Sequence, residues 1–220
     1  MVVSIVHRGY KYILMGLPCY DTATQHTIVE KIIEFAKSKV KIDFVVADRF
    51  FSNSEYINIF EKLHVKYSLI AKNNDEVRYI KSLSAPRSMP SVAIDDAKTN
   101  IITICDKKEN KNLAYMTNIK INPDNQNEVA MLSARLDEVY HSRGNIENAF
   151  EMIKSILAKT TSNRHFIKYY YFLFACCLYN LWIIAEHIIS VVIHGFLKIK
   201  TSIRFRSFLK DVLDQVILFT

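Results

Sequence analysis

The chain has 220 residues, half of them apolar and with 13 Phe and 12 Tyr, so it can bury a substantial core and is not a disordered chain. Its formal net charge of +7 fits a polyanionic partner, and its four cysteines show no CxxC spacing, which argues against a zinc site or a disulfide framework. Reduced thiols and the lack of a recognisable signal peptide predict a cytoplasmic protein.

The first third of the chain predicts alternating strands and helices. Expected strands cover residues 1–17, with a break at Gly9, 42–47 and 67–71, and expected helices cover 22–39 and 54–62. Ser52 or Asn53 is placed to cap the second helix. This order predicts a parallel α/β sheet, in which Asp48 follows the buried strand IDFVVA at the carboxyl edge, where ligands gather.

Residues 74–130 break this alternation. Pro86 and Pro90 mark turns, and short strands are expected at 92–94, 101–105 and 113–117, separated by the polar segments DDAKTN and KKENKN. The pattern predicts a small antiparallel β subdomain.

Residues 137–157 predict one amphipathic helix. Its apolar residues recur at helical spacing: Val139, Ile146, Phe150, Ile153 and Leu157. Beside them, within an arc of roughly 60°, lie Tyr140, Arg143, Glu147 and Lys154. A carboxylate between two cations suits a divalent metal ion and phosphate oxygens. The alternative is a solvated face with i,i+4 ion pairs.

The spacing Tyr-x2-Arg-x3-Glu-x6-Lys resembles the Tyr-Arg-Glu-Lys signature of DDE-type insertion-sequence transposases of the IS-four group. Two further segments are similar to the same family. Residues 45–73 resemble its second-aspartate region, in which a hydrophobic strand delivers Asp followed by Arg and an aromatic residue. Residues 160–182 resemble the next element, a Thr-Ser turn before a core helix that ends in Asn180, Leu181 and Trp182.

The resemblance implies a ribonuclease H-like mixed sheet flanked by helices, with a mainly β insertion between the second and third acidic positions and a helical C-terminus. The corresponding domains are a catalytic domain over 1–73 and 131–190 without its first strand, the insertion over 74–130, and a basic amphipathic tail over 191–220. Solvent, DNA or a partner chain are the alternatives for the surface that this tail faces.

The resemblance also implies metal-dependent cleavage and transfer of DNA strands. On this interpretation Asp48 and Glu147 are catalytic metal ligands of a two-ion Mg²⁺ or Mn²⁺ site. Arg143, Lys154 and Lys72 bind backbone phosphates, and Tyr140 positions the strand near the cut. The expected partner is DNA at transposon ends, with a possible homodimer, no small-molecule cofactor and no membrane.

The first acid of the family has no counterpart that fits. Asp43 opens the strand that Asp48 closes, and too few elements follow Asp21. We therefore expect an N-terminally incomplete copy with weak, salt-dependent DNA binding and impaired cleavage. Gly144 is a second departure, because the family commonly has tryptophan there and glycine costs helix stability by up to about 1 kcal/mol.

One segment supports a different class of protein. Residues 169–185 run without a charge and approach the length of a membrane span. Asn180 inside it, and Lys168 and Glu186 at its ends, favour a buried core helix. The alternatives are a membrane-associated protein anchored by 169–185, a non-catalytic DNA-binding transposase remnant, and a plain nuclease on the same scaffold.

Overall fold

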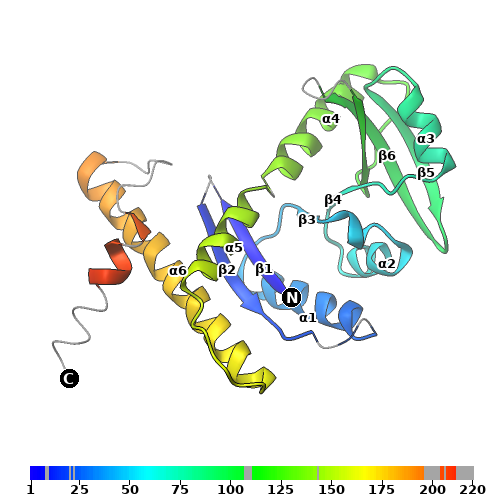
Figure 1. Cartoon of the computed structure of the whole chain (residues 1–220). Coiled ribbons are helices and arrows are strands. Elements are labelled where there is room, and N and C mark those ends of the chain that lie inside the picture. The colour runs from blue at the N-terminus through cyan, green and yellow to red at the C-terminus, as the bar shows by residue number, and fades with distance from the viewer. Residues whose placement is uncertain are drawn as a thin grey trace. The chain divides into compact units, whose positions relative to one another are not determined.

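The computed structural model describes residues 1–7, 10–19, 21, 23–106, 111–142, 144–195, 204–205 and 207–211 (Figure 1). It forms two compact units. The sheet unit contains Met1 and Cys19–Gly144, and the hairpin unit contains Val2–Pro18 and Asn145–Thr220. Each unit has its own hydrophobic core.

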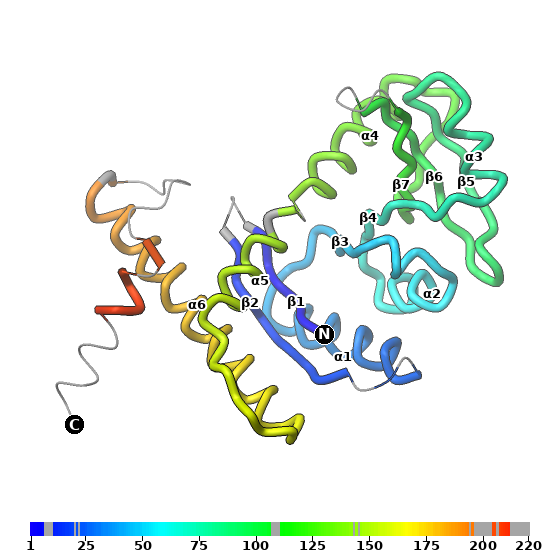
Figure 2. The backbone as a smooth tube through the Cα atoms, viewed as in Figure 1, coloured from blue at the N-terminus to red at the C-terminus, as the bar shows by residue number. Residues whose placement is uncertain are grey.

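The sheet unit is built on a five-stranded mixed sheet (Figure 2). In spatial order the strands are β3 (Val45–Ala47), β4 (Tyr67–Ile70), β7 (Lys111–Thr117), β6 (Ala97–Asp106) and β5 (Arg87–Ile94). Strands β3 and β4 pair in parallel, and the other pairs are antiparallel.

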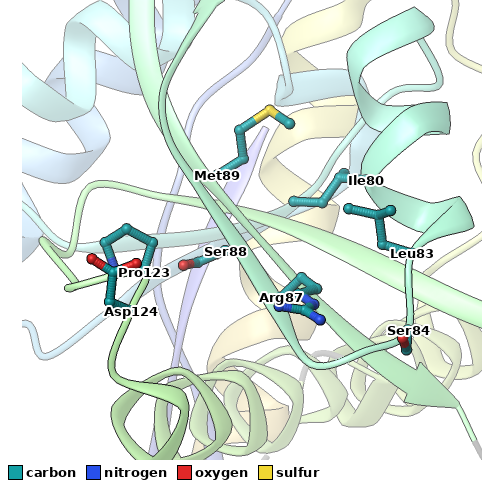
Figure 3. A pocket seen from close by; sticks show the side chains of 8 residues that line it. All are labelled: Ile80, Leu83, Ser84, Arg87, Ser88, Met89, Pro123 and Asp124. Carbon is teal, nitrogen blue, oxygen red and sulfur yellow. The ribbon is translucent and has the colours of Figure 1, made fainter.

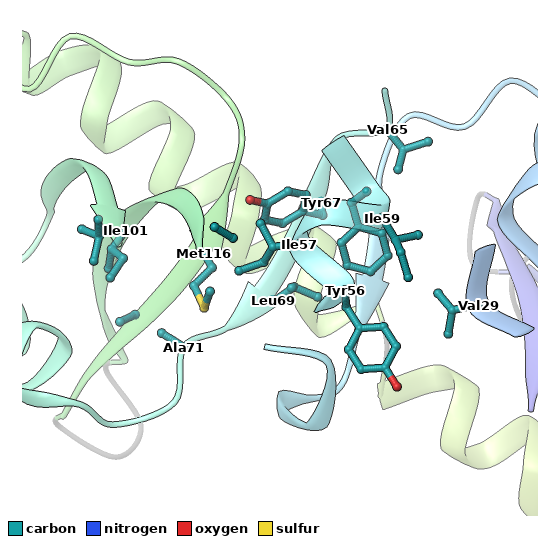
Figure 4. Packing of buried hydrophobic residues seen from close by; sticks show 14 of the residues in the cluster. Val29, Tyr56, Ile57, Ile59, Val65, Tyr67, Leu69, Ala71, Ile101 and Met116 are labelled. Atoms are coloured by element: carbon teal, nitrogen blue, oxygen red, sulfur yellow. The ribbon is translucent and has the colours of Figure 1, made fainter. Parts of the chain in front are cut away.

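Helices cover both faces of this sheet. They are α1 (Gln25–Lys39), the 3-10 turn η1 (Arg49–Phe51), α2 (Ser54–Lys62), α3 (Asp75–Ser82) and α4 (Gln126–His141). Neighbouring residues of β6 point to opposite sides. Ile101 packs with α2 residues in the main core (Figure 4). Ile102 packs with Leu136 of α4 in a separate cluster. The predicted mixed sheet flanked by helices is confirmed.

The segment from β3 to β4 follows the sequence prediction closely. Helix α2 ends at Lys62 as predicted, and of the two predicted caps it is the Asn53 side chain that accepts a hydrogen bond from Tyr56 N, at 3.2 Å. Its inward residues Tyr56 and Phe60 are buried, as the helical spacing predicts. Burial of Leu69 and Tyr67 fixes β4 beneath this helix.

The expectation that the N-terminal segment adds a strand to the parallel α/β series was wrong. Within the described residues, β1 (Val2–His7) and β2 (Tyr10–Gly16) pair only with each other, as an antiparallel two-stranded sheet. They form the hairpin unit with α5 (Gly144–Ile156) and α6 (His165–His194). Ile13 of β2 is buried against these helices, so the hairpin packs on α5 and α6 through an apolar contact.

The prediction of one continuous helix over 137–157 was also wrong. Helix α4 begins at Gln126, ends at His141, and is followed by α5 from Gly144. Ser142 Oγ donates to Val139 O at 2.6 Å, a local bond that competes with the helical backbone pattern. Gly144 then adds the lowest helix propensity of the non-proline residues at this point.

The region predicted as a β insertion contributes strands and helices to the sheet unit. Strands β5, β6 and β7 are longer than expected, and a register shift between Met89 and Val92 accommodates Pro90 inside β5. Helix α3 and the first part of α4 were not predicted. The predicted domain limits at residues 73, 130 and 190 stay a prediction.

Helix α6 contains the uncharged segment. In the described part of the chain it is the one helix long and apolar enough to cross a membrane, and 33% of its apolar window is buried. One face packs in the hairpin-unit core through Ala175, Tyr179 and Trp182, and the opposite face exposes Phe174, Leu181 and other apolar side chains. The predicted tail over 191–220 falls mostly outside the described residues.

The polar side chain inside the apolar part of α6 is paired with strand β2. Asn180 Nδ2 donates to Ile13 O at 2.8 Å, and Asn180 Oδ1 accepts from Ile13 N at 2.9 Å. Seven residues further along α6, a second polar side chain lies on the same face, since Tyr12 OH of β2 and His187 Nδ1 are 2.5 Å apart. The amide is therefore satisfied by protein rather than by lipid or water.

The first prediction concerns this amide. Asn180→Leu should lower the free energy of unfolding of the hairpin unit by about 1–3 kcal/mol, because it leaves the N–H and C=O of Ile13 unpaired. Urea unfolding followed by the fluorescence of Trp182, the single tryptophan, measures this change. Leu181→Ala, at an exposed neighbouring position, is the matched control with a smaller effect. An equal free energy of unfolding for Asn180→Leu and the wild type would contradict a stabilising role for the Asn180–Ile13 hydrogen bonds.

Candidate functional site

Asp48 lies at the carboxyl edge of the parallel strand pair. Its neighbour Ala47 pairs with Leu69 of β4, so β3 and β4 end at the same edge of the sheet. Asp48 is exposed, and its Oδ1 accepts a hydrogen bond from Arg49 N at 2.7 Å, which caps η1. The turn that follows is tied to β4, because Ser52 Oγ donates to Ile70 O at 2.5 Å.

Lys72 is exposed just beyond β4, at the same edge as Asp48. Ala71 N donates to Ala114 O of β7 at 2.9 Å, so the backbone before Lys72 is held in the sheet. Asn73 comes next and accepts a hydrogen bond from Lys81 Nζ of α3 at 2.9 Å. The edge therefore presents a carboxylate and cations together.

Sequence reasoning missed Lys81 because it placed no helix after residue 74. The signal was present: Asn74 caps α3 by accepting from Val77 N at 2.8 Å, and Asp75 and Glu76 lie in its first turn. An N-cap, two acids and a terminal lysine are typical of a short helix.

Tyr140 lies on α4 as part of a hydrophobic cluster. Its ring centroid is 5.5 Å from that of Tyr115, and the side chain is half-buried. Tyr115 OH in turn donates to Asp137 Oδ1 at 2.5 Å. Burial, together with this hydrogen bond, raises the pKa of Tyr115 well above its usual range. Tyr140 therefore has a packing role in this cluster.

Glu147 and Lys154 both lie on α5, and both are exposed. Seven residues separate them, so they share one face and stand roughly 10 Å apart along the helix axis. Arg143, the remaining member of the predicted signature, lies outside the described residues.

The predicted site residues divide between the two units. Asp48, Lys72 and Tyr140 belong to the sheet unit, and Glu147 and Lys154 belong to the hairpin unit. The convergence of Asp48 and Glu147 on one metal ion stays a prediction.

The donor chemistry of the two acids suits a hard divalent cation. Asp48 and Glu147 are exposed carboxylates, the ligand type that Mg²⁺ and Mn²⁺ prefer. Within the described ranges, no group of three His, Cys, Asp or Glu side chains is gathered to hold a metal ion.

A pocket of about 420 Å³ lies elsewhere in the sheet unit (Figure 3). The end of α3, the start of β5 and the loop before α4 line it, with Arg87 and Asp124 as its charged residues. Ser88 Oγ is buried there without a hydrogen-bond partner in the described structure. No predicted site residue lines this pocket, so it is not the predicted metal site.

The chain is thus an α/β protein in which an exposed acid, Asp48, follows one of two parallel strands, β3 and β4. Residues 19–181 match the family model described as the transposase DDE domain. This match covers well over half of the chain, which therefore belongs to this transposase family. Proteins of this family carry out DNA transposition by strand cleavage and transfer, and they generally use divalent metal ions.

The fold is similar to that of the piggyBac transposase in the cryo-EM structure of its synaptic complex with hairpin DNA. The TM-score is 0.57 at 15% sequence identity, and the similarity covers 91% of this chain and 42% of that one. The chain thus spans less than half the length of that transposase, and the predicted ribonuclease H-like fold class is confirmed. No curated protein matches the sequence.

The second prediction tests the packing role of Tyr140. Tyr140→Ala should destabilise the sheet unit by about 1–2 kcal/mol, because the aromatic contact with Tyr115 is lost. Tyr140→Phe keeps the ring and should match wild type. Thermal unfolding followed by near-ultraviolet circular dichroism of the tyrosines measures both variants. Unchanged stability of Tyr140→Ala would show that the ring contact contributes nothing.

Proposed function

We propose that the chain is the catalytic part of an IS-four group transposase, which cleaves and transfers DNA strands at the ends of an insertion sequence. The observation that carries the proposal is the position of Asp48 at the carboxyl edge of β3 and β4, within the residues that match the transposase family. The Tyr-Arg-Glu-Lys spacing of Tyr140, Arg143, Glu147 and Lys154 supports the assignment to the group.

The reaction is an in-line displacement at phosphorus. Mg²⁺ or Mn²⁺, held by Asp48 and Glu147, would supply the Lewis acid that stabilises charge on the transferring phosphate. Both carboxylates have the exposure that a ligand in a DNA-binding cleft requires. A hydroxyl oxygen forms the new bond to phosphorus, and the 3′ or 5′ oxygen of the cut strand leaves.

The cationic side chains in this proposal hold the DNA backbone. Lys154 shares the face of α5 with Glu147, so it can grip a phosphate next to the acid. Lys72 does the same beside Asp48, Arg143 binds a further phosphate, and Tyr140 positions the strand. DNA at the ends of the element is the partner, in the cytoplasm, and a homodimer would bring two ends together.

We propose that the chain binds DNA but cleaves it poorly, because neither Asp43 nor Asp21 is placed like the first acid of the family. Asp43, at the far end from Asp48, forms an ion pair with Arg135 at 3.0 Å. Asp21 caps the turn before α1, where its Oδ1 accepts from Thr24 N at 2.8 Å. Both acids thus have local structural partners.

Membrane association is the second candidate function, and it draws on the exposed apolar face of α6. Against it, Asn180 and His187 find their partners on β2 within the hairpin unit. Recovery of the expressed chain in the soluble fraction without detergent would remove this candidate.

The third prediction tests the transposase proposal. The purified chain should bind a 20-base-pair duplex with an affinity that falls steeply with salt, since each neutralised phosphate adds about −0.9 to the logarithmic slope. Fluorescence anisotropy at a series of salt concentrations measures it. Absence of binding at low salt would refute the proposal.

Metal dependence is tested with the same protein. Asp48→Asn should weaken the binding of Mn²⁺, followed by electron paramagnetic resonance, and Asp43→Asn should not. An equal loss of Mn²⁺ binding in Asp48→Asn and Asp43→Asn would show that Asp48 is not a specific metal ligand. Strong Mg²⁺-dependent strand transfer by the wild-type chain would contradict the impaired activity.

A further inference from the structure

A half-buried lysine at the edge of the sheet unit lies among other cations. Lys81 is in the last turn of α3, and its Nζ donates to Asn73 Oδ1 at 2.9 Å. Because Asn73 closely follows β4, this bond brings the ammonium group to the edge at which β3 and β4 end. The bond to Asn73 thereby holds the ammonium group of Lys81 at this edge of the sheet.

Strand β7 holds α3 in this position. Asn112 Nδ2 donates to Lys81 O at 2.8 Å and to Leu83 O at 2.9 Å, so the end of α3 is clamped to the start of β7. Since β7 runs antiparallel to β4, its first residue, Lys111, lies at the same edge of the sheet as the end of β4. A third cation, Arg49, follows Asp48 at the end of β3.

Arg49 and Lys111 both lie close enough to Lys81 to affect its charge. Burial, followed by the positive charges of Arg49 and Lys111, lowers the pKa of Lys81 below its ordinary value. In the described part of the chain Lys81 forms no ion pair, and its hydrogen-bond partner, Asn73, is neutral. A half-buried ammonium group among like charges is stabilised when an anion binds beside it.

We propose that Arg49, Lys81 and Lys111 form a phosphate-binding site at the carboxyl edge of the sheet unit, and that this site takes a phosphodiester of the DNA strand that passes Asp48. The inference rests on the proposed function and adds a contact that the transposase signature does not contain. The planar guanidinium of Arg49 can bind two phosphate oxygens, and the two ammonium groups act as point charges.

Asp106 limits the position of the anion. It is the cross-strand partner of Lys111 at the end of β6. The phosphate therefore lies on the side of Arg49 and Lys81, and Asn73 acts as a positioning residue that directs Lys81 toward it.

The fourth prediction is that Lys81→Gln weakens DNA binding several-fold and reduces the logarithmic salt slope by about 0.9, the value for one phosphate contact. Anisotropy of a labelled 20-base-pair duplex at several salt concentrations measures both quantities. Lys98→Gln is the matched control, because Lys98 is exposed near the start of β6, at the opposite edge of the sheet. Lys81→Arg keeps the charge and should restore the slope, and circular dichroism confirms that each variant is folded.

Two outcomes separate this site from the proposed function. If the wild type binds DNA and Lys81→Gln has the same slope as Lys98→Gln, the phosphate site is refuted and the transposase proposal stands. If the wild type binds no DNA at any salt concentration, both are refuted.

A titration with inorganic phosphate, followed by NMR, distinguishes the source of the phosphate. Binding that depends on Lys81 for inorganic phosphate, but not for the duplex, would overturn the assignment to DNA. Dependence on Lys81 in the duplex titration, with only weak binding of free phosphate, is the expected result.

Discussion

The parallel pairing of β3 with β4 is the constraint on which the proposed site depends. Both strands end at one edge, and Asp48 occupies that edge because Ala47 is paired with Leu69. Leu69 and Tyr67 are completely buried, so the register of β4 cannot slip by one residue without turning core side chains to the opposite face. The position of the carboxylate is therefore set by the core beneath it.

Part of this arrangement could be predicted from the sequence because it depends on local patterns. The apolar strand before Asp48 and the Asn53 cap of α2 are signals that short segments carry by themselves. Pairing between distant strands is not local, which is why the antiparallel hairpin of β1 and β2 was taken for part of a parallel sheet. The break between α4 and α5 was missed because the heptad-like spacing of apolar residues continues across Gly144.

The roles of the candidate site residues stay predictions, but the positions of several of them follow from local patterns. Asp48 stands where a buried strand should deliver a ligand, and Glu147 and Lys154 share one helix face as their spacing requires. Tyr140 differs, because contact with the Tyr115 ring cannot be read from the spacing of one helix. Lys81 reaches the edge through the Asn112 clamp, a contact between α3 and β7 that only the folded chain reveals.

The Asn180 amide has a consequence for how the hairpin unit can assemble. One side chain engages both backbone groups of a single residue, Ile13, in the observed alignment of β2 along α6. Sliding the strand by one residue would turn these backbone groups away from the amide and rotate Ile13 away from the helices. Asn180, a polar residue within an apolar helix, thus disfavours a one-residue shift of β2 against α6.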